Sequence, residues 1–302
     1  MISILVPVYN DAQSLKELHA RILKSLENRP EKFEIVFVND GSRDNSWEIM
    51  KELKPLRAVC HQRNYGNTPA LDTAIQHAQG EILVFLDADL QNNPADISKF
   101  IDKINSGFDV VVGWRKKRYD PWRRLVFSKV ANLLVRFLLD LKIHDFGCGL
   151  RAYRARFIKD FRLWGNMQIF LPALAKERGA IIGEVEISHS PRVFRGSGMK
   201  ISKMAKTVFD LFAVIFFLRY FIKPFRFFGG WGFFFTLVGF LFWFSTSLSF
   251  GSDSGILFVS GTMFVVLGIV LFAVGFLTDV LLRLYWKDGH YFYFIREEIE
   301  NK

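Results

Sequence analysis

Cysteine is scarce in this sequence, and the common nucleotide-binding signatures are missing. Only Cys60 and Cys148 occur among 302 residues. Their spacing matches neither a disulfide framework nor a zinc site, and we predict that both are buried thiols, since free cysteine behaves mainly as a small hydrophobic residue. No G-x-G-x-x-G follows the first apolar run, and no G-x-x-x-x-G-K-[ST] occurs. These absences argue against a dinucleotide site or a P-loop.

Acidic residues are outnumbered, with 30 Asp and Glu against 40 Lys and Arg. Residues 190–230 contain eight basic residues and one acid. Because this charge is interleaved with apolar sequence, we expect residues 199–228 to form one or two helices lying in a membrane interface. A solvated basic face is the alternative. The same interleaving argues against nucleic-acid binding.

Two long runs have no charge at all, residues 229–250 and residues 255–278. Each exceeds the roughly 20 residues that cross a bilayer core. Basic residues lie before the first run and after the second, whereas the short loop between the runs has no Lys or Arg. This distribution predicts that both termini are cytoplasmic. No basic segment precedes the first apolar run, so we expect the N-terminal part to stay on that side. A buried helical hairpin in a soluble protein is the alternative.

Glycines recur at seven-residue spacing within each run, at Gly232 and Gly239 in the first and at Gly261, Gly268 and Gly275 in the second. Small residues at such spacing are typical of close helix–helix contacts in membranes. The contact is either between copies of the chain, giving a homo-oligomer, or between the two runs of one chain.

The first 112 residues alternate apolar runs with longer helical patterns. The runs are 2–6, 33–38, 56–60, 81–86 and 108–112, and the helical patterns are 12–27, 45–54, 68–78 and 94–105. This alternation predicts an α/β domain with a parallel, doubly wound sheet. Ligands bind at the carboxyl ends of such strands. The polar clusters that follow three of the runs, residues 7–11, 39–42 and 87–91, should therefore meet at one edge.

The third cluster has the donor set of a hard-cation site. Asp87, Asp89 and Gln91 follow a very apolar run. Carboxylate and amide oxygens at this spacing suit Mg²⁺ or Mn²⁺ carrying a diphosphate. By itself a D-x-D pair is equally a helix N-cap before Pro94, and the N-D-G-S segment with Asp40 is equally a plain turn.

Five motifs taken together carry a resemblance to a known family. They are V-P-V-Y-N-D (6–11), V-N-D-G-S-R-D-N-S (38–46), R-N-Y-G (63–66), L-D-A-D-L-Q (86–91) and D-F-G-C-G-L-R-A-Y-R (145–154). In this order, followed by two apolar runs, they resemble family 2 glycosyltransferases that charge polyprenyl phosphates, such as dolichol-phosphate mannose synthases and bacterial undecaprenyl-phosphate aminoarabinose or glucose transferases. The resemblance implies a GT-A-like, mostly parallel sheet domain, interfacial amphipathic helices and two transmembrane helices.

The resemblance also implies roles for residues on the donor side. A nucleotide-sugar would be held by Pro7, Tyr9, Asp11, Asp40, Arg63 and Asp87, and the metal by Asp87, Asp89 and Gln91. Asp11 stands where the family often has Glu, and Asn39 where it has Asp, but neither change removes an acceptor oxygen. Asp89, Arg115, Arg124 and Asp145 would be catalytic.

On the acceptor side, the lipid phosphate would be bound by Arg115, Arg124, Ser128 and Arg151. A solvated helix face is the alternative for residues 115–129, and a salt bridge or turn cap is the alternative for Asp145 and Arg151. Arg192, Arg195, Ser197 and Lys200 resemble a mobile lid over the diphosphate. A Gly-Met pair separates Ser197 from Lys200, which departs from the family pattern and leaves the phosphate-binding basic residue open.

We therefore expect a cytoplasmic glycosyltransferase domain over residues 1–195, a lid and interfacial helices over 196–228, two transmembrane helices over 229–284 and a tail over 285–302. The expected reaction moves one sugar from a nucleotide-sugar to undecaprenyl or polyprenyl phosphate at the bacterial inner membrane. We favour UDP as the nucleotide, and we expect the configuration of the anomeric carbon to be inverted. A GDP-mannose enzyme, a processive polysaccharide synthase and a silent membrane scaffold are the competing hypotheses. The Q-x-x-R-W motif of the processive enzymes does not occur.

Overall fold

The computed structural model describes residues 1–116, 141, 143–163, 165, 167–188, 190, 224–248 and 253–287. The chain divides into two compact units, Met1–Val214 and Ile215–Lys302. We describe each unit by itself.

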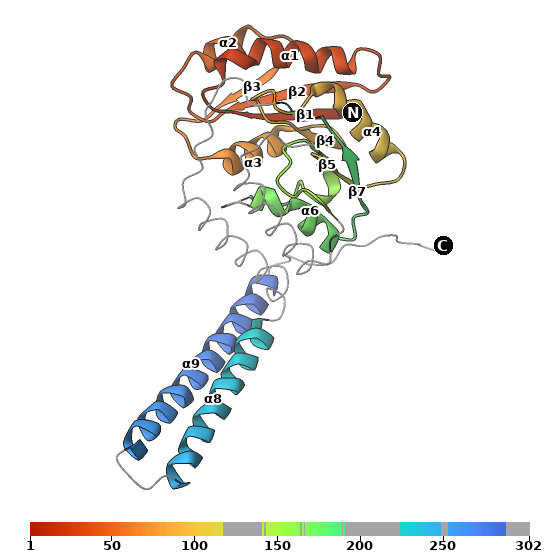
Figure 1. Ribbon diagram of the computed structural model, residues 1–302. Coiled ribbons are helices and arrows are strands. Elements are labelled where there is room, and N and C mark those ends of the chain that lie inside the picture. Colours follow the sequence, from red (N-terminus) through yellow and green to blue (C-terminus); the bar gives the residue numbers. More distant parts are fainter. Residues whose placement is uncertain are drawn as a thin grey trace. The chain divides into compact units, whose positions relative to one another are not determined.

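A seven-stranded sheet forms the centre of the first unit (Figure 1). Its strands are β1 (Ile2–Val8), β2 (Phe33–Asn39), β3 (Arg57–Cys60), β4 (Ile82–Phe85), β5 (Val110–Trp114), β6 (Arg151–Arg154) and β7 (Ile182–Glu186). The spatial order is β3-β2-β1-β4-β6-β5-β7. All neighbouring pairs are parallel except those of β6, which runs antiparallel to β4 and to β5. The predicted mostly parallel α/β sheet is thus confirmed, with one reversed strand that the alternating pattern did not predict.

Helices cover both faces of the sheet. They are α1 (Ala12–Leu26), α2 (Ser46–Glu52), α3 (Asn67–His77), α4 (Ile97–Asn105) and α6 (Met167–Glu177), with short 3-10 turns at Pro94–Asp96 and Ala155–Phe157. Figure 1 shows α1 and α2 on one side of the sheet and α3 and α6 on the other. The alternation of side chains along β1 explains this division, because Ile4 and Val6 join the core under α1 and α4 while Pro7 faces the opposite side.

The register places the functional loops at one edge. Val8 at the end of β1 pairs with Asn39 at the end of β2, and Leu5 pairs with Phe85 at the end of β4. Because β6 is antiparallel, its first residue, Arg151, is opposite Phe85. The loop that leads into β6 therefore lies at the same edge as the carboxyl ends of the parallel strands.

The two cysteines differ in exposure. Cys148 is fully buried, as predicted, and burial raises the pKa of its thiol to about 12. Cys60 is exposed, so the prediction of a second buried thiol is wrong. Cys60 lies at the end of β3, the edge strand of the sheet, which pairs with another strand on one side only in the described part of the chain.

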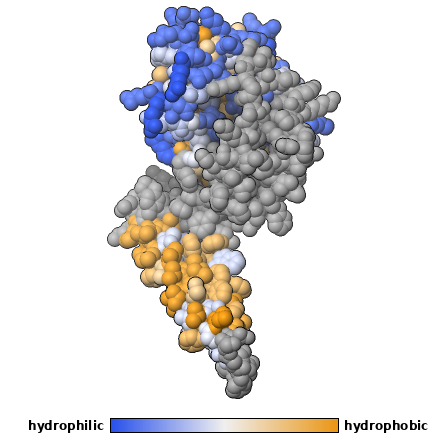
Figure 2. All heavy atoms as spheres, turned by 60° about the vertical axis from the view of Figure 1, so that its left-hand side comes forward, coloured by the Kyte–Doolittle hydropathy of each residue, from blue (hydrophilic) through white to orange (hydrophobic). Residues whose placement is uncertain are grey.

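The second unit contains two long helices, α8 (Pro224–Leu248) and α9 (Asp253–Lys287). Within them, Pro224–Thr246 and Ser254–Leu282 are long and apolar enough to cross a membrane, by length and composition. Large apolar side chains such as Phe233, Phe244 and Ile256 are exposed along both helices, and Figure 2 shows this apolar surface in orange. Two candidate membrane helices after the sheet domain agree with the sequence prediction.

The spaced glycines lie between α8 and α9. A Cβ added at Gly232 would be 2.9 Å from the carbonyl oxygen of Gly268, and one added at Gly239 would be 2.7 Å from that of Gly261. Of the two contacts left open by the sequence, the one within a single chain is therefore observed. The indole N–H of Trp243 adds a 3.2 Å hydrogen bond to the Thr262 hydroxyl across the same pair of helices.

Candidate active site

Asp87 and Asp89 leave the sheet at the end of the fully buried strand β4. Ala88, between the two acids, and Leu90, after them, are buried. The two acids lie on the other side of the chain and are partly exposed. Oδ1 of Asp89 accepts a 3.2 Å hydrogen bond from the backbone N–H of Gln91, which turns the chain back toward the core. The structure thus places Asp87, Asp89 and Gln91 in one short turn.

These donors fit a divalent cation that is shared with a bound ligand. In the described part of the chain, no cluster of three or more His, Cys, Asp or Glu side chains is placed to hold a metal ion. Mg²⁺ and Mn²⁺ bound through one or two carboxylates normally take their remaining oxygens from substrate phosphates and water. Two carboxylates at this edge are the kind of donor set that such a shared site uses.

Gly149, in the loop before β6, sits directly against Asp87. A Cβ at Gly149 would lie 1.8 Å from Oδ2 of Asp87 and 2.5 Å from its Cγ. Contacts below 3.0 Å are essentially never made by a real Cβ. Only glycine lets the loop approach this closely, so the D-F-G-C-G-L-R segment forms one wall around the first acid of the D-x-D pair.

Arg115 and Asp145 form a buried, two-pronged ion pair. Nε of Arg115 donates to Oδ2 of Asp145 at 2.6 Å, and Nη2 donates to Oδ1 at 3.0 Å. Their residues are 9 % and 3 % exposed. Asp145 also accepts the backbone N–H of Gly147 at 3.1 Å. The pair therefore fastens the end of β5 to the loop that also touches Asp87, and brings together two of the predicted catalytic residues.

Arg151 is held by backbone carbonyl groups. Its guanidinium donates to the carbonyl oxygens of Phe146, Cys148, Gln168 and Ile169. These bonds join the loop before β6 to the first turn of α6. The observed contacts are those of the turn-cap alternative, and phosphate binding by Arg151 stays a prediction.

Asp40 is buried at 2 % exposure and connects two loops. Its carboxylate accepts the backbone N–H groups of Tyr65 at 2.9 Å and Gly66 at 2.8 Å. Nδ1 of His61 lies 3.0 Å from the same carboxylate, and Nε2 of His61 lies 2.9 Å from the Thr73 hydroxyl. Asp40 therefore orders the R-N-Y-G loop, and its contact with a nucleotide stays a prediction.

The turn after β2 packs on that same loop. Gly41 has φ +61°, and a Cβ there would lie 2.3 Å from the backbone carbon of Arg63. Arg63 itself is exposed, with its guanidinium 4.7 Å from the centre of the Tyr65 ring. This arrangement leaves the cation and the ring of the R-N-Y-G loop available at the surface beside Asp40.

A set of short hydrogen bonds joins the loop after β1 to the turn after β2. The backbone N–H of Asn10 donates to the Ser42 hydroxyl at 2.9 Å, and that of Ala12 donates to Asp44 at 3.1 Å. Burial raises the pKa of Asp44, but hydrogen bonds from Ser46 and Ala12 outweigh it, so the pKa of Asp44 lies below its usual value. Pro7, Tyr9 and Asp11, the predicted nucleotide-binding residues of this loop, are all partly exposed.

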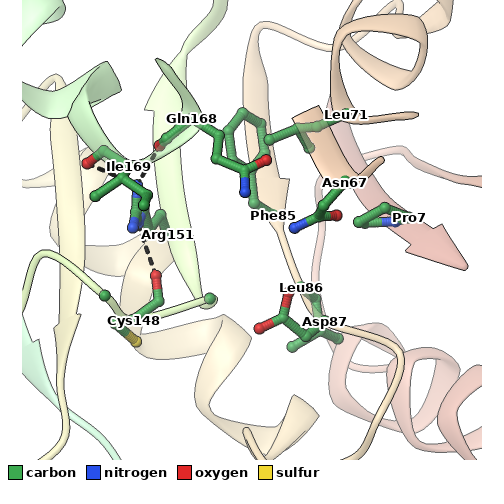
Figure 3. A pocket seen from close by; sticks show the side chains of 12 residues that line it. Pro7, Asn67, Leu71, Phe85, Leu86, Asp87, Cys148, Arg151, Gln168 and Ile169 are labelled. Carbon is green, nitrogen blue, oxygen red and sulfur yellow. Dashed lines mark hydrogen bonds between the residues drawn. The ribbon is translucent and has the colours of Figure 1, made fainter. Parts of the chain in front are cut away.

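A cavity of about 300 Å³ opens beside Asp87 (Figure 3). It is formed by the ends of β1 and β4, the loop before β6, and the first turns of α3 and α6. Its lining residues are Pro7, Asn67, Leu71, Phe85, Leu86, Asp87, Gly147, Cys148, Gly149, Arg151, Gln168 and Ile169. Asn67 and Gln168 were not predicted, because a single amide at the start of a helix has no sequence signature. His61 was not among the predicted site residues, because its contact with Asp40 joins two loops 21 positions apart.

Six predicted residues lie outside the described part of the chain. They are Arg124, Ser128, Arg192, Arg195, Ser197 and Lys200. Most of the predicted interfacial segment, residues 199–228, lies outside it too.

The chain belongs to glycosyltransferase family 2. Residues 3–162 match that family, described as Glycosyl transferase family 2. Two relatives align over nearly the whole chain. Dodecaprenyl-phosphate galacturonate synthase of Rhizobium johnstonii is 32 % identical over 95 % of this chain and 89 % of its own length. Undecaprenyl-phosphate 4-deoxy-4-formamido-L-arabinose transferase of Pseudomonas syringae is 33 % identical over 94 % and 86 %. The relatives are of the polyprenyl-phosphate sugar transferase type, as the motifs predicted.

Solved structures confirm the GT-A-like fold. Glucosyl-3-phosphoglycerate synthase from Mycobacterium tuberculosis, in complex with Mn²⁺ and UDP-glucose, has a TM-score of 0.57 and 16 % sequence identity, with 71 % of this chain and 78 % of that chain covered. The same enzyme in complex with UDP has a TM-score of 0.56 and 15 % identity, with 72 % and 79 % covered. At this identity the likeness concerns the fold alone.

Proposed function

We propose that the protein is a membrane-anchored, inverting glycosyltransferase that moves one sugar from a UDP-sugar to the phosphate of a polyprenyl phosphate on the cytoplasmic leaflet. One observation carries this proposal most strongly. The loop from Asp145 to Arg151 contacts Asp87 through Gly149 and Arg115 through Asp145. A single loop thus joins the predicted diphosphate side to the predicted acceptor side, and the names of the two long-aligned relatives describe transfer to or synthesis on polyprenyl phosphate.

On the donor side, Asp87, Asp89 and Gln91 would hold Mg²⁺ or Mn²⁺. When bound, the cation neutralises charge on the leaving nucleoside diphosphate. Structural neighbours have been solved in complex with Mn²⁺ and UDP or UDP-glucose, which supports a divalent cation in this fold. The loops after β1 and β2, together with the R-N-Y-G loop that Asp40 orders, would bind the nucleoside.

On the acceptor side, a phosphate monoester is largely dianionic at neutral pH, since its second pKa is about 6. It already is a nucleophile, so the protein has to position it and balance its charge rather than remove a proton. Arg115, with Arg124 and Ser128, is proposed to do so. Attack by the lipid phosphate in a single displacement inverts the anomeric carbon.

The helices α8 and α9 would anchor the protein in the membrane that contains the acceptor. Their exposed apolar side chains would face lipid, and the basic residues of 190–230 would face anionic headgroups. We propose that the catalytic domain ends at residue 195, the lid and interfacial helices at residue 228, and the transmembrane helices at residue 284. Both termini would be cytoplasmic, and the membrane would be a bacterial inner membrane.

Transfer of labelled sugar into an organic-extractable product tests the proposal. Purified full-length protein is incubated with undecaprenyl phosphate, Mg²⁺ or Mn²⁺, and matched panels of UDP- and GDP-sugars. Label in the organic phase from a UDP-sugar is expected, whereas label from GDP-mannose would favour the GDP-mannose enzyme. Metal-independent nucleotide binding without transfer from any donor would favour the scaffold hypothesis.

A further inference from the structure

Two successive contacts fasten the loop before β6 to the end of β5. Arg115 and Asp145 form the buried ion pair described above. The residues directly before them, Trp114 and His144, stack their rings on each other, with centroids 4.4 Å apart and planes 18° from parallel. An aromatic contact is thus followed at once by an ionic one, and together they set how the loop lies on the strand.

Strand β7 holds the same point of the loop. Its residue Glu184 accepts the backbone N–H of His144 at 2.6 Å with Oε1, and Oε2 lies 2.7 Å from Nδ1 of the imidazole. One carboxylate therefore fixes both the main chain and the ring of His144, and with them the angle at which the ring meets Trp114. The side chain of Glu184 is only 16 % exposed, so water competes little for these two bonds.

The strand register explains why β7 can reach the loop. β7 is parallel to β5, and Val112 pairs with Glu184 while Trp114 pairs with Glu186. Alternate residues of a strand share a face, so Glu184 and Glu186 project from the face that carries the Trp114 ring. Glu186 forms an exposed ion pair with Lys116, at 3.0 Å, just after β5. The two acids thus share a strand and a face but bond to different segments.

The bonds of Glu184 are one residue from the proposed acceptor side. They end on His144, and the next residue, Asp145, holds the guanidinium of Arg115 through two bonds. Because a two-pronged pair has a fixed geometry, a rotation of this carboxylate turns the guanidinium with it. A shift of the main chain at His144 is therefore passed on to the group that is proposed to bind the acceptor phosphate.

The part of the loop that touches the donor side is held separately. The guanidinium of Arg151 donates to the carbonyl oxygens of Phe146 and Cys148, and these bonds do not involve β7. They lie between the Glu184 contact and Gly149, which packs on Asp87. We therefore expect a disturbance at β7 to reach the ion pair much more strongly than the donor side.

We infer that Glu184 is a positioning residue for the acceptor: through His144 it sets the orientation of the Asp145–Arg115 pair, and hence the affinity for a lipid phosphate. The inference rests on the proposed function, because it takes Arg115 to bind the acceptor phosphate. Glu184 acts through the loop and is assigned no contact with either substrate.

Binding measurements on variants of β7 test the inference. Microscale thermophoresis gives the Kd of the purified full-length protein in detergent for undecaprenyl phosphate and, with Mn²⁺ present, for UDP. Glu184→Leu removes both bonds, and we expect the Kd for undecaprenyl phosphate to rise about tenfold while the Kd for UDP does not change. Glu184→Gln keeps an oxygen for the N–H of His144 and should stay within about threefold of the wild type. Glu186→Leu is the matched control, the same change two residues along the strand, and should bind both ligands as the wild type does.

The outcomes separate positioning from folding. Unchanged binding of undecaprenyl phosphate by Glu184→Leu would overturn the inference. Equal losses of affinity for undecaprenyl phosphate and UDP would also overturn it, because they would show that the cluster only supports the fold. Wild-type protein that binds UDP but not undecaprenyl phosphate would contradict the acceptor of the proposed function, and the inference would fall with it.

A double-mutant cycle tests whether Glu184 acts through His144. His144→Phe keeps a ring beside Trp114 but has no Nδ1, and we expect the Kd for undecaprenyl phosphate to rise about threefold. In the double variant the loss should be no larger than in Glu184→Leu alone, since contacts within one unit are not additive. Losses that multiply would overturn the path through His144. His144→Phe leaves β7 unaltered, so wild-type binding by this variant counts against the inference even where Glu184→Leu does not fold.

Discussion

Substitution of Gly149 by alanine adds one methyl group against the first acid of the D-x-D pair. The new Cβ would lie 1.8 Å from Oδ2 of Asp87, where at least 3.0 Å is required. The carboxylate must therefore move by about 1.2 Å or the loop must retreat by a similar amount. Gly149 does not have a positive φ in the left-handed range, so alanine can adopt its backbone conformation and the conflict is with Asp87.

A displacement of about 1 Å at a reacting centre costs on the order of 100-fold in rate. We expect Gly149→Ala to lower kcat/KM for sugar transfer by that order, and to raise the Mn²⁺ concentration needed for half-maximal activity. Overpacking costs about 1–3 kcal/mol of stability, so the variant should still fold, which far-UV circular dichroism and thermal unfolding check.

Gly147→Ala in the same loop is the control for loop stiffness. Among the described residues its Cβ would be nearest to Nη2 of Arg115, at 3.3 Å, which requires a shift of only a few tenths of an ångström, and we expect a loss about tenfold smaller than in Gly149→Ala. Transfer by Gly149→Ala at the wild-type rate and with the wild-type metal dependence would refute the reasoning that this glycine positions Asp87.

Other substitutions and reactions test separate parts of the structure. Asp89→Ala should lower transfer by about 100-fold or more, with the protein still recovered in the membrane fraction; wild-type activity would contradict its role as a metal ligand. Arg115→Met leaves a buried acid without its observed partner and should cost about 3–5 kcal/mol in the free energy of unfolding by denaturant titration. With a thiol reagent at pH 8, Cys60 should react quickly and Cys148 only after unfolding, since a pKa of about 12 leaves about one thiolate in 10,000; two fast thiols would refute the burial of Cys148. Gly268→Leu, whose Cβ would lie 2.7 Å from the carbonyl oxygen of Gly232, should separate α8 from α9 and lower the thermal stability in detergent, and an unchanged melting temperature would contradict that packing.

The parallel part of the sheet could be predicted because each of its elements has a clear period. Leu15, Leu18 and Ile22 mark one face of α1, and the strands β1, β2 and β4 are mostly apolar and largely buried on both faces. Strand β6 lacks such a signal. It is four residues long with an arginine at each end, and its reversed direction follows from pairing with β4 and β5, which no local pattern encodes.

The candidate site shows the same division between local and distant contacts. Asp87 and Asp89 could be predicted because they directly follow an apolar strand. The placement of Gly149 on Asp87 could not, because the two residues are 62 positions apart and meet only when β6 pairs with β4. Asn67 and Gln168 were missed for a similar reason, since a cavity between α3 and α6 is a property of packing.

The central claim is that the acceptor nucleophile is a phosphate on a lipid. The experiment compares undecaprenyl phosphate with undecaprenol as acceptors for the full-length protein, with the same labelled UDP-sugar and Mn²⁺. The anomeric configuration of the product is then determined. We expect label in lipid only with the phosphate, released by mild acid, with the anomeric configuration inverted relative to the donor. Equal transfer to the alcohol, or a product with retained configuration, would contradict it.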